Sequence, residues 1–428
     1  MSEFKPPFHL SAPHLNRQKL REEIRKNRER IEELGPGIIT GGAGDDPAGI
    51  VTYTAVGANT GYSLLWLMLL STPMMIAVQN MAARLALVTG KSLPEIVRAF
   101  YSRNLSVFMV LMLSVANIIT VGADLQGVAS VLELLTGIKS VHFLIPITAL
   151  IAYLVMFKAY RTVKRVFMGL TFVLFAYILA AFAANPDLNA VWINTFVPHI
   201  RWNTAYALAA LGLLGTTISP YLLFWQASEE KEEHKTVAQA RQVGWDTALG
   251  MIYSNLIAFA IIIAGAVLLY GGHHPLNSVR DAAMALLPLG KENAFLFFTL
   301  GILAAGFLAI PVLAGSTAYA VADTFGWREG LDYKVSDAKG FYTIFFGALV
   351  IGDLIYLSPF TAVQALYYSQ ILDGILLPIL VGILLILSSN RKIVGQFKNS
   401  VFNRIFGWLA LLISSTFTLL MMYRAIFG

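Results

Sequence analysis

The chain has 428 residues, of which 57% are hydrophobic and only 13% are charged, and its formal net charge is +6. A mean hydropathy of +0.66 is far too apolar for a soluble domain. No cysteine is present, which excludes disulfides and thiolate metal ligands. The composition therefore predicts an all-α polytopic membrane protein.

The N-terminal segment, residues 1–34, is polar and carries no recognisable cleavable signal peptide. Its stretch HLNRQKLREEIRKNRERIEEL predicts a charged helix with a narrow apolar stripe. We expect this helix to lie on the inner membrane surface. A gating role is the alternative, although charged stripes are mostly solvated faces. Residues 35–428 are predicted to form a single transmembrane domain.

Eleven apolar runs in that domain have the roughly 20-residue length that a membrane-spanning helix needs. They cover residues 36–58, 62–88, 105–135, 142–158, 163–184, 204–228, 244–270, 294–321, 338–357, 361–388 and 403–426. No linker between them is long enough to hold a soluble domain.

The first run contains the stretch GPGIITGGAGDDPAG, with two carboxylates, two prolines and six glycines at membrane depth. Asp45 and Asp46 are costly in hydrocarbon unless they face a cavity, a cation or a partner. Pro47 removes an amide and clashes with the preceding turn. The run therefore predicts a broken helix that carries an ion site; the alternative is a helix end or an extracellular loop.

The third run contains GADLQG, which places Asp124 and Gln126 at membrane depth. Asp124 has two equally plausible roles: it forms a structural pair with Arg84, or it lines an aqueous path for cations or protons.

The sixth run is interrupted by Gly215, Ser219 and Pro220. Breaks at corresponding positions of two halves are the best sequence indicator of a binding site at the middle of the membrane. The alternative for this run alone is an ordinary proline kink. We therefore predict a five-plus-five inverted repeat with helices 1 and 6 broken: repeat one over about 35–185, repeat two over about 204–388, and an eleventh helix over about 403–426.

Two later runs also carry polar residues. The seventh begins with Asp246 and later holds Asn255, and the tenth carries Gln370 and Asp373 one turn apart. Gln370 can offer an amide oxygen to a hard cation, and Asp373 adds charge if it faces inward. Interhelical hydrogen bonding is the more common role for a single glutamine in a membrane helix.

All histidines lie in tails, loops or helix ends, so no imidazole is expected at the middle of the membrane. The remaining donors are oxygens of Asp, Gln, Ser, Thr and unwound carbonyls, which favour Mg²⁺, Ca²⁺ or Mn²⁺ over zinc or copper. Motifs of covalent catalysis and of soluble cofactors are absent, so we expect neither an enzyme nor a bound cofactor.

The placement of basic residues predicts the orientation. With the N-terminus inside, the outer side holds only Lys139, Arg201, Arg280, Lys291 and Arg424. Arg84 lies within a predicted span, and the other lysines and arginines lie inside. This distribution satisfies the positive-inside rule and places the C-terminus outside. We expect a prokaryotic inner-membrane protein that is monomeric, contacts the lipid bilayer and binds no nucleic acid.

Seven motifs in chain order resemble the natural resistance-associated macrophage protein (NRAMP) family of divalent-metal transporters. They are GPGIITGGAGDDPAGIVT (35–52), GYSLLW (61–66), ARLALVTGKSLPEIVR (83–98), GADLQG (122–127), GTTISPY (215–221), Asp246-Thr247 and SQILDGILLP (369–378). The resemblance extends from residue 35 to about 388. It implies a LeuT-type fold, alternating access, and a metal held between helices 1 and 6.

The ion-site motifs depart from the family pattern. Asp-Pro-Gly-Asn is replaced by Asp46-Pro47-Ala48-Gly49, so the aspartate is kept and the asparagine ligand is lost. Met-Pro-His becomes Ser219-Pro220-Tyr221, which lacks the thioether. Asp124 is followed by Gly127 where proton-coupled members carry Asp-x-x-Glu, and Gln226 replaces a second histidine. Much of the proton route that the family implies is thus missing.

A roomy site lined by oxygens suits partly hydrated Mg²⁺, which sheds water reluctantly. The chain is therefore most similar to the divergent NRAMP-related magnesium transporters, with Mn²⁺ also accepted and proton coupling weak or absent. The resemblance and the residues together suggest a metal site at Asp46, Asp45, Ala43, Gly49, Ser219, Tyr221, Gln370 and Asp373, and a pathway at Asp124, Gln126 and Gln226.

Three other functions remain open. The first is a proton-coupled Mn²⁺/Fe²⁺ carrier of the conventional NRAMP type. The second is a Na⁺-coupled symporter for an organic substrate, although Asp45 and Asp46 would repel a carboxylate. The third is a membrane enzyme or receptor, for which the chain shows no nucleophile and base.

Overall fold

The computed structural model describes residues 44–157, 169, 171–232, 240–271, 276–331 and 333–427, and every regular element in these ranges is helical. They belong to the unit formed by residues 36–428. Predictions on residues 1–34 and on Ala43 fall outside the described residues.

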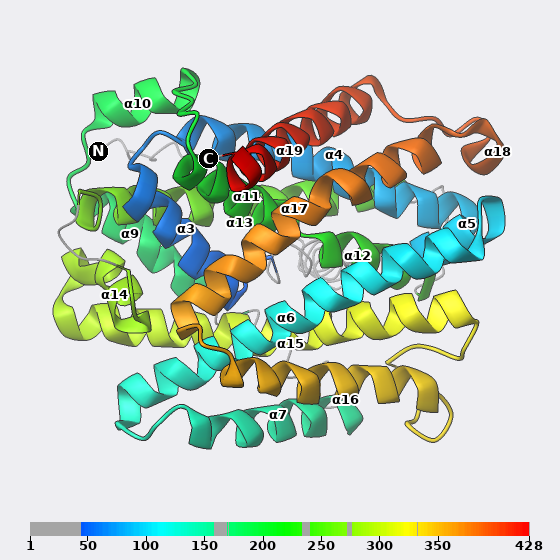
Figure 1. Ribbon diagram of the computed structural model, residues 1–428, viewed down its shortest axis with the longest axis horizontal. Coiled ribbons are helices and arrows are strands. Elements are labelled where there is room, and N and C mark those ends of the chain that lie inside the picture. Colours follow the sequence, from blue (N-terminus) through cyan, green and yellow to red (C-terminus); the bar gives the residue numbers. More distant parts are fainter. Residues whose placement is uncertain are drawn as a thin grey trace, which may run out of the picture. The chain divides into compact units, whose positions relative to one another are not determined.

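The helices alternate long spanning segments with short connecting ones (Figure 1). In the first half they are α3 (Pro47–Thr60), α4 (Leu65–Thr89), α5 (Leu93–Phe100), α6 (Arg103–Thr136), α7 (Val141–Met156), η1 (Thr171–Leu174), α9 (Phe175–Ala183) and α10 (Leu188–Phe196). In the second half they are α11 (Thr204–Thr217), α12 (Pro220–Glu232), α13 (Ala240–Leu268), α14 (Val279–Ala283), η3 (Met284–Leu289), α15 (Lys291–Phe325), α16 (Lys339–Asp353), η4 (Leu354–Leu357) and α17 (Ala362–Ser389). α18 (Arg391–Val394) and α19 (Val401–Phe427) end the chain.

Each of the eleven predicted apolar runs contains a helix of the structure. Within the described residues, eight helices are long and apolar enough to cross a membrane, counting α11 and α12 together. The prediction of a polytopic membrane protein is thereby confirmed. The short helices α5 and α10 were not expected. For α5 a sequence signal exists, because Glu95 accepts a hydrogen bond from the amide of Ser92 as in a capping box.

Local chemistry sets the start of α3 and the break between α11 and α12. α3 begins at Pro47, whose fixed φ suits the first helical position, and Asp46 caps it. α11 ends at Thr217 and α12 begins at Pro220, so Ile218 and Ser219 are outside both helices. An uninterrupted, merely kinked sixth helix is therefore excluded.

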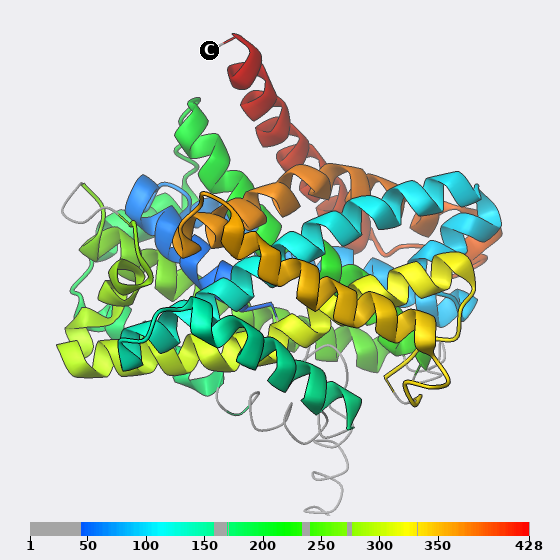
Figure 2. The same ribbon diagram turned by 60° about the horizontal axis from the view of Figure 1, so that its bottom comes forward.

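The broken helices lie in the centre of the helix packing. α3 packs against α11 and α13, and α11 packs against α17. α6 and α15 run side by side, with α16 and α7 next to them (Figure 1). α19 is the most exposed span, with 22% of its apolar window buried, and its C-terminal half extends beyond α17 (Figure 2). This exposure suits a helix whose outer face contacts lipid.

Glycines allow α11 and α17 to approach within backbone contact. A Cβ atom on Gly215 would lie 2.0 Å from the carbonyl oxygen of Gln370, and one on Gly374 would lie 2.1 Å from the carbonyl oxygen of Leu211. Both obstacles are backbone atoms, which cannot rotate away. The close contact sets the position of Gln370 relative to the break between α11 and α12.

We expect Gly215→Ala to destabilise the protein by about 2 kcal/mol or more, because α11 and α17 must separate to admit the methyl group. The measurement is thermal unfolding of the purified protein in detergent. Gly347→Ala on α16 is the matched control, since its Cβ would meet no atom within 4 Å. Equal melting temperatures for the two variants would contradict the prediction.

Candidate functional site

Asp46 connects the two broken helices. Its side chain is 1% exposed, and one carboxylate oxygen accepts a hydrogen bond from the amide of Gly49 at the start of α3. The hydroxyl of Tyr221, at the start of α12, donates to the other oxygen over 3.4 Å. Two predicted site residues from opposite halves of the chain therefore meet at this carboxylate.

Gly49 has a spatial reason to lack a side chain. A Cβ atom there would lie 2.6 Å from Oγ1 of Thr216 and 3.0 Å from Oδ1 of Asp46. The glycine thus lets the first turn of α3 approach the end of α11. Its backbone amide donates to Asp46. Because it has no side chain, position 49 lacks the side-chain amide oxygen that an asparagine would supply.

Asp124 on α6 reaches the same region. Its Oδ1 accepts a hydrogen bond of 3.0 Å from the amide of Ala48, and its Oδ2 is buried without a hydrogen-bond partner among the described residues. The predicted structural pairing with Arg84 is wrong, because that guanidinium donates to the backbone carbonyl of Lys398 instead. Asp124 therefore keeps one oxygen available within the protein interior.

α17 contributes Gln370 and Asp373. Both are buried, and Oε1 of Gln370 has no hydrogen-bond partner in the described part of the chain. The Gln370 amide nitrogen contacts only Ser369 of its own helix, at 3.5 Å. The alternative of an interhelical hydrogen bond is thus not supported. Asp373 lies beside Thr120 of α6 and within electrostatic range of Asp46.

Three buried carboxylates, those of Asp46, Asp124 and Asp373, interact electrostatically around Tyr221. The ion pairs of the described residues centre on Lys231, and none reaches these three groups. A buried carboxylate requires a cation, a proton or a set of hydrogen bonds. The arrangement is therefore suited to receive a positively charged ion.

Carboxylates alone do not complete a metal site. In the described ranges, no three Asp, Glu, His or Cys side chains converge closely enough to hold a metal ion. Other oxygens would have to contribute. Among the predicted residues, Tyr221 contacts Asp46, and Gln370 has a buried amide oxygen without a partner in the described part of the chain. The hydroxyl of Ser219 already donates to the carbonyl of Thr216 over 2.7 Å, and its own carbonyl accepts from the amide of Leu222 over 3.2 Å.

Asp45 points toward a different neighbour from Asp46. The hydroxyl of Ser254 on α13 donates to its Oδ1 over 2.8 Å, and its Oδ2 is buried. Tyr53 lies in electrostatic range of both aspartates and beside Thr216. Ser254, Tyr53 and Thr216 were not predicted. Tyr53 follows Asp46 by seven residues, which is two helical turns. This spacing places both residues on the same face of the helix and could have indicated that Tyr53 belongs to the site.

The predicted pathway glutamines occupy separate places. Gln126 on α6 is buried, and its Oε1 has no partner within the described residues. Gln226 on α12 donates from Nε2 to Oγ1 of Thr247 on α13 over 2.8 Å. This hydrogen bond therefore links α12 to α13. Asn255, also on α13, bonds instead to Thr72 of α4 over 2.7 Å.

An ion-pair cluster, here called the Lys231 cluster, holds the far end of α12. Nζ of Lys231 lies 2.8 Å from Glu95 of α5, 2.8 Å from Asp323 of α15 and 2.7 Å from Glu329 in the loop after α15. Next to it, Tyr319 donates to Glu232. Any movement of α12 relative to α5 and α15 must break these contacts.

The Lys231 cluster should make stability depend on pH. Burial, and then the neighbouring Asp323, raise the pKa of Glu329 from 4.5 to about 9, against the opposing effect of Lys231. The folded protein therefore holds a proton that the unfolded chain releases, so this contribution to stability declines as pH rises through that window. We expect the melting temperature of Glu329→Gln, measured relative to that of the wild type, to rise as the pH is raised from about 5 to about 9.

The check is a melting curve at several pH values for the wild type, for Glu329→Gln and for the control Glu292→Gln, an exposed residue of α15. The control should follow the wild type. If Glu329→Gln also follows the wild type, Glu329 does not bind the proton.

Known proteins match nearly the whole chain. The family profile described as natural resistance-associated macrophage protein-like matches residues 37–424. The divalent metal cation transporter MntH of Bacillus subtilis (strain 168) is 27% identical over 401 residues, which cover 90% of this chain and 91% of that protein.

Solved structures match the fold. The manganese transporter of Eremococcus coleocola, in complex with an aromatic bis-isothiourea substituted compound, superposes with a TM-score of 0.73 at 22% identity, over 92% of this chain and 86% of that chain. A nucleobase-cation-symport-1 family transporter in a closed conformation gives a TM-score of 0.55 at 12% identity, over 92% and 93%. The predicted LeuT-type fold with its five-plus-five repeat is confirmed, and helix 6 is broken between α11 and α12. The first half of the predicted broken helix 1 falls outside the described residues.

Proposed function

The chain belongs to the natural resistance-associated macrophage protein-like family, and on that premise we propose that it is a secondary transporter that moves divalent metal cations across the membrane by alternating access. The main support is that buried Asp124 and Asp373 lie within electrostatic range of Asp46 at the start of α3, away from the ion pairs of the described residues. The similar proteins are named as transporters of divalent metal cations and of manganese.

Mg²⁺ is the proposed main substrate, with Mn²⁺ also accepted. The oxygens around Asp46 come from its own carboxylate, from the hydroxyl of Tyr221, and from Asp124 and Asp373 in electrostatic range. We assign the buried, unpartnered amide oxygen of Gln370 to the same set. Such a set suits hard cations, and Mg²⁺ keeps several of its waters. Soft ligands favour transition metals, and position 219 offers a hydroxyl in place of the thioether that the family pattern carries.

Proton coupling is proposed to be weak or absent. Asp124 has no acidic partner one turn later, because Gly127 stands there. A Cβ atom on Gly127 would lie 3.1 Å from Leu366 and 3.6 Å from Pro47, so the position faces an apolar, closely packed environment. Uptake would then be driven by the ion gradient and by the membrane potential, worth roughly 2.3 kcal/mol per charge per 100 mV.

A proton-coupled Mn²⁺/Fe²⁺ carrier is the second candidate. The free oxygen of Asp124 favours it, because a buried carboxylate of that kind can take up a proton. A Na⁺-coupled organic symporter is disfavoured by the negative charge of Asp45 and Asp46. We further propose that it is an inner-membrane protein that acts as a monomer. The positive-inside distribution supports a cytoplasmic N-terminus and an outer C-terminus.

The deciding experiment is flux into liposomes that contain the purified full chain, an internal Mg²⁺ or Mn²⁺ dye and a pH probe. We expect Mg²⁺ entry without stoichiometric acidification, at a rate that rises with an inside-negative potential. Mn²⁺ entry with acidification and no Mg²⁺ entry would establish the second candidate. The absence of flux of either ion would reject divalent-cation transport.

A further inference from the structure

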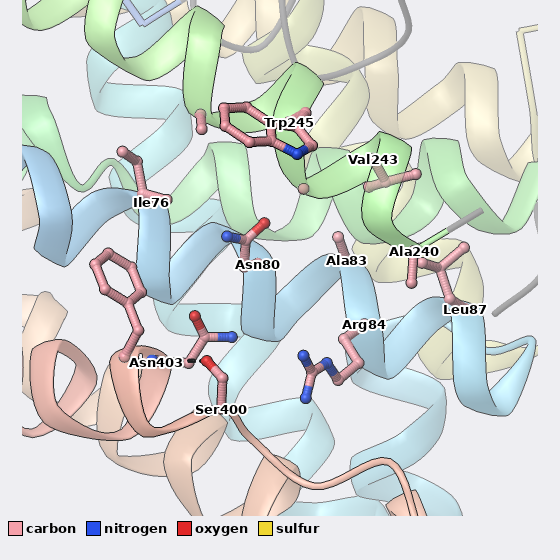
Figure 3. A pocket seen from close by; sticks show the side chains of 13 residues that line it. Ile76, Asn80, Ala83, Arg84, Leu87, Ala240, Val243, Trp245, Ser400 and Asn403 are labelled. Atoms are coloured by element: carbon pink, nitrogen blue, oxygen red, sulfur yellow. Dashed lines mark hydrogen bonds between the residues drawn. The ribbon is translucent and has the colours of Figure 1, made fainter. Parts of the chain in front are cut away.

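A cavity of about 510 Å³ lies between α4, α13 and α19, apart from the carboxylates described above (Figure 3). It lies at the C-terminal end of α4 and at the N-terminal ends of α13 and α19. The adjacent segments carry Lys91, Arg391, Lys392, Lys398 and Arg404. By the positive-inside distribution, this is the inner side of the membrane.

One part of the cavity is lined by hydrogen-bond donors. Arg84 and Asn80 come from α4, Asn403 comes from the first turn of α19, and Ser400 directly precedes that helix (Figure 3). The Arg84 guanidinium donates one N–H group to the carbonyl of Lys398, which leaves four of its five donors for a ligand. The start of α19 adds the positive end of a 27-residue helix, whose Asn403 amide donates to the hydroxyl oxygen of Ser400.

The charge of the lining is one-sided. None of the thirteen described lining residues carries a carboxylate, and Arg84 is the one that carries a full charge. Arg84 lies five residues before the end of α4, which corresponds to a depth of about 8 Å at 1.5 Å per residue. An arginine at that depth, beside two amides and a helix N-terminus, favours an anion located at the level of lipid headgroups.

The rest of the cavity is apolar and opens toward lipid-facing side chains. Trp245 of α13 is 63% exposed and points into the space shown in Figure 3. Phe402 lines the cavity at the start of α19, and Trp408 is 51% exposed on the next two turns. Tryptophans at this level are typical of the membrane interface. An acyl chain could therefore continue from the donors along the face of α19.

We propose that this cavity binds an acidic phospholipid of the inner leaflet, with the lipid phosphate at Arg84, Asn80 and the N-terminus of α19 and an acyl chain beside Trp245. The positively charged Arg84 and the neighbouring amide side chains match a phosphate in charge. The neighbouring apolar surface can contact the acyl chain of a lipid, whereas a free phosphate ion has no group that would contact it. The inference concerns a lipid site and is independent of the transported ion.

The test is native mass spectrometry of the full chain, purified in detergent and titrated with phosphatidylglycerol, phosphatidylcholine or inorganic phosphate. We expect phosphatidylglycerol to be retained at one high-affinity position, and Arg84→Gln to weaken that binding about tenfold, as for the loss of one hydrogen bond to a charged group. Arg391→Gln is the matched control, because it removes an exposed inner-side arginine of α18 that does not line the cavity.

A second measurement tests the position of the lipid. Phosphatidylglycerol brominated in the acyl chain should quench a saturable part of the tryptophan fluorescence, and Trp245→Phe should remove that part. Asn80→Leu replaces Arg84→Gln if the latter fails to fold. The proposal is overturned if Arg84→Gln and Arg391→Gln bind equally, if phosphatidylcholine binds as tightly as phosphatidylglycerol, or if inorganic phosphate alone displaces the lipid at equal concentration.

Discussion

Asp46→Asn is expected to reduce Mg²⁺ and Mn²⁺ influx by at least about a hundredfold while the protein remains folded. Asparagine can still accept the hydrogen bond from Gly49 that caps α3, so the helix start is preserved. The negative charge that faces Tyr221 and shares its surroundings with Asp124 and Asp373 is lost. Removing one partner of a buried charge pair typically costs about 3 kcal/mol or more, which corresponds to this factor.

The measurement is dye-based influx in liposomes, with ion binding followed by calorimetry. Asp187→Asn is the matched control: Asp187 also caps a helix, α10, by accepting from the amides of Asn189 and Ala190, and it lies far along the chain on an exposed segment. The control should transport normally. If Asp46→Asn transports at the wild-type rate, Asp46 is not the charged ligand.

Ser219→Met is expected to change which ion is preferred. The residue is 1% exposed, lies in the break between α11 and α12, and precedes Tyr221, which contacts Asp46. A thioether there would add a soft donor, which favours Mn²⁺ or Cd²⁺ over Mg²⁺. We expect the ratio of Mn²⁺ to Mg²⁺ influx to rise about tenfold, a difference of roughly 1.4 kcal/mol. Competition between the two ions in liposomes measures this ratio.

Ser219→Leu separates the sulfur from the size of the new side chain. Leucine and methionine have similar volumes, so both variants disturb the packing and displace water to a similar degree. The leucine variant should lose Mg²⁺ flux without a gain in Mn²⁺ flux. If the two variants show the same ion ratio, the sulfur has no effect at this position, and the proposed explanation of Mg²⁺ preference fails.

The helix breaks were predictable because local chemistry determines them. Proline cannot continue the helix that precedes it, and Asp46 supplies the cap that a new helix needs. The same argument applies at Pro220, where the chain leaves α11 and starts α12. The short helices α5 and α10 were missed, although each carried a capping signal: the Ser92–Glu95 pair for α5 and Asp187 for α10.

The pairings of the polar side chains were harder to predict. Arg84 and Asp124 both lie within predicted spans, which suggested an ion pair, but α4 presents Arg84 to the backbone before α19. Asp45 and Asp46 are neighbours in sequence, yet they contact Ser254 and Tyr221 on different helices. Such differences depend on which face each helix presents to its neighbours.

The sequence by itself determined the membrane class, the helix start at Pro47, the break before Pro220 and the family, because hydropathy, proline, glycine and capping residues act within a few residues of chain. Only the tertiary structure decided that Asp124 and Asp373 approach Asp46, that Ser219 turns its hydroxyl to the backbone, and that Asp45 faces α13. The physical reason is the packing of α11 against α17 and of α3 against α13 at backbone distance, which sets the rotation of each helix and hence the direction of every buried carboxylate.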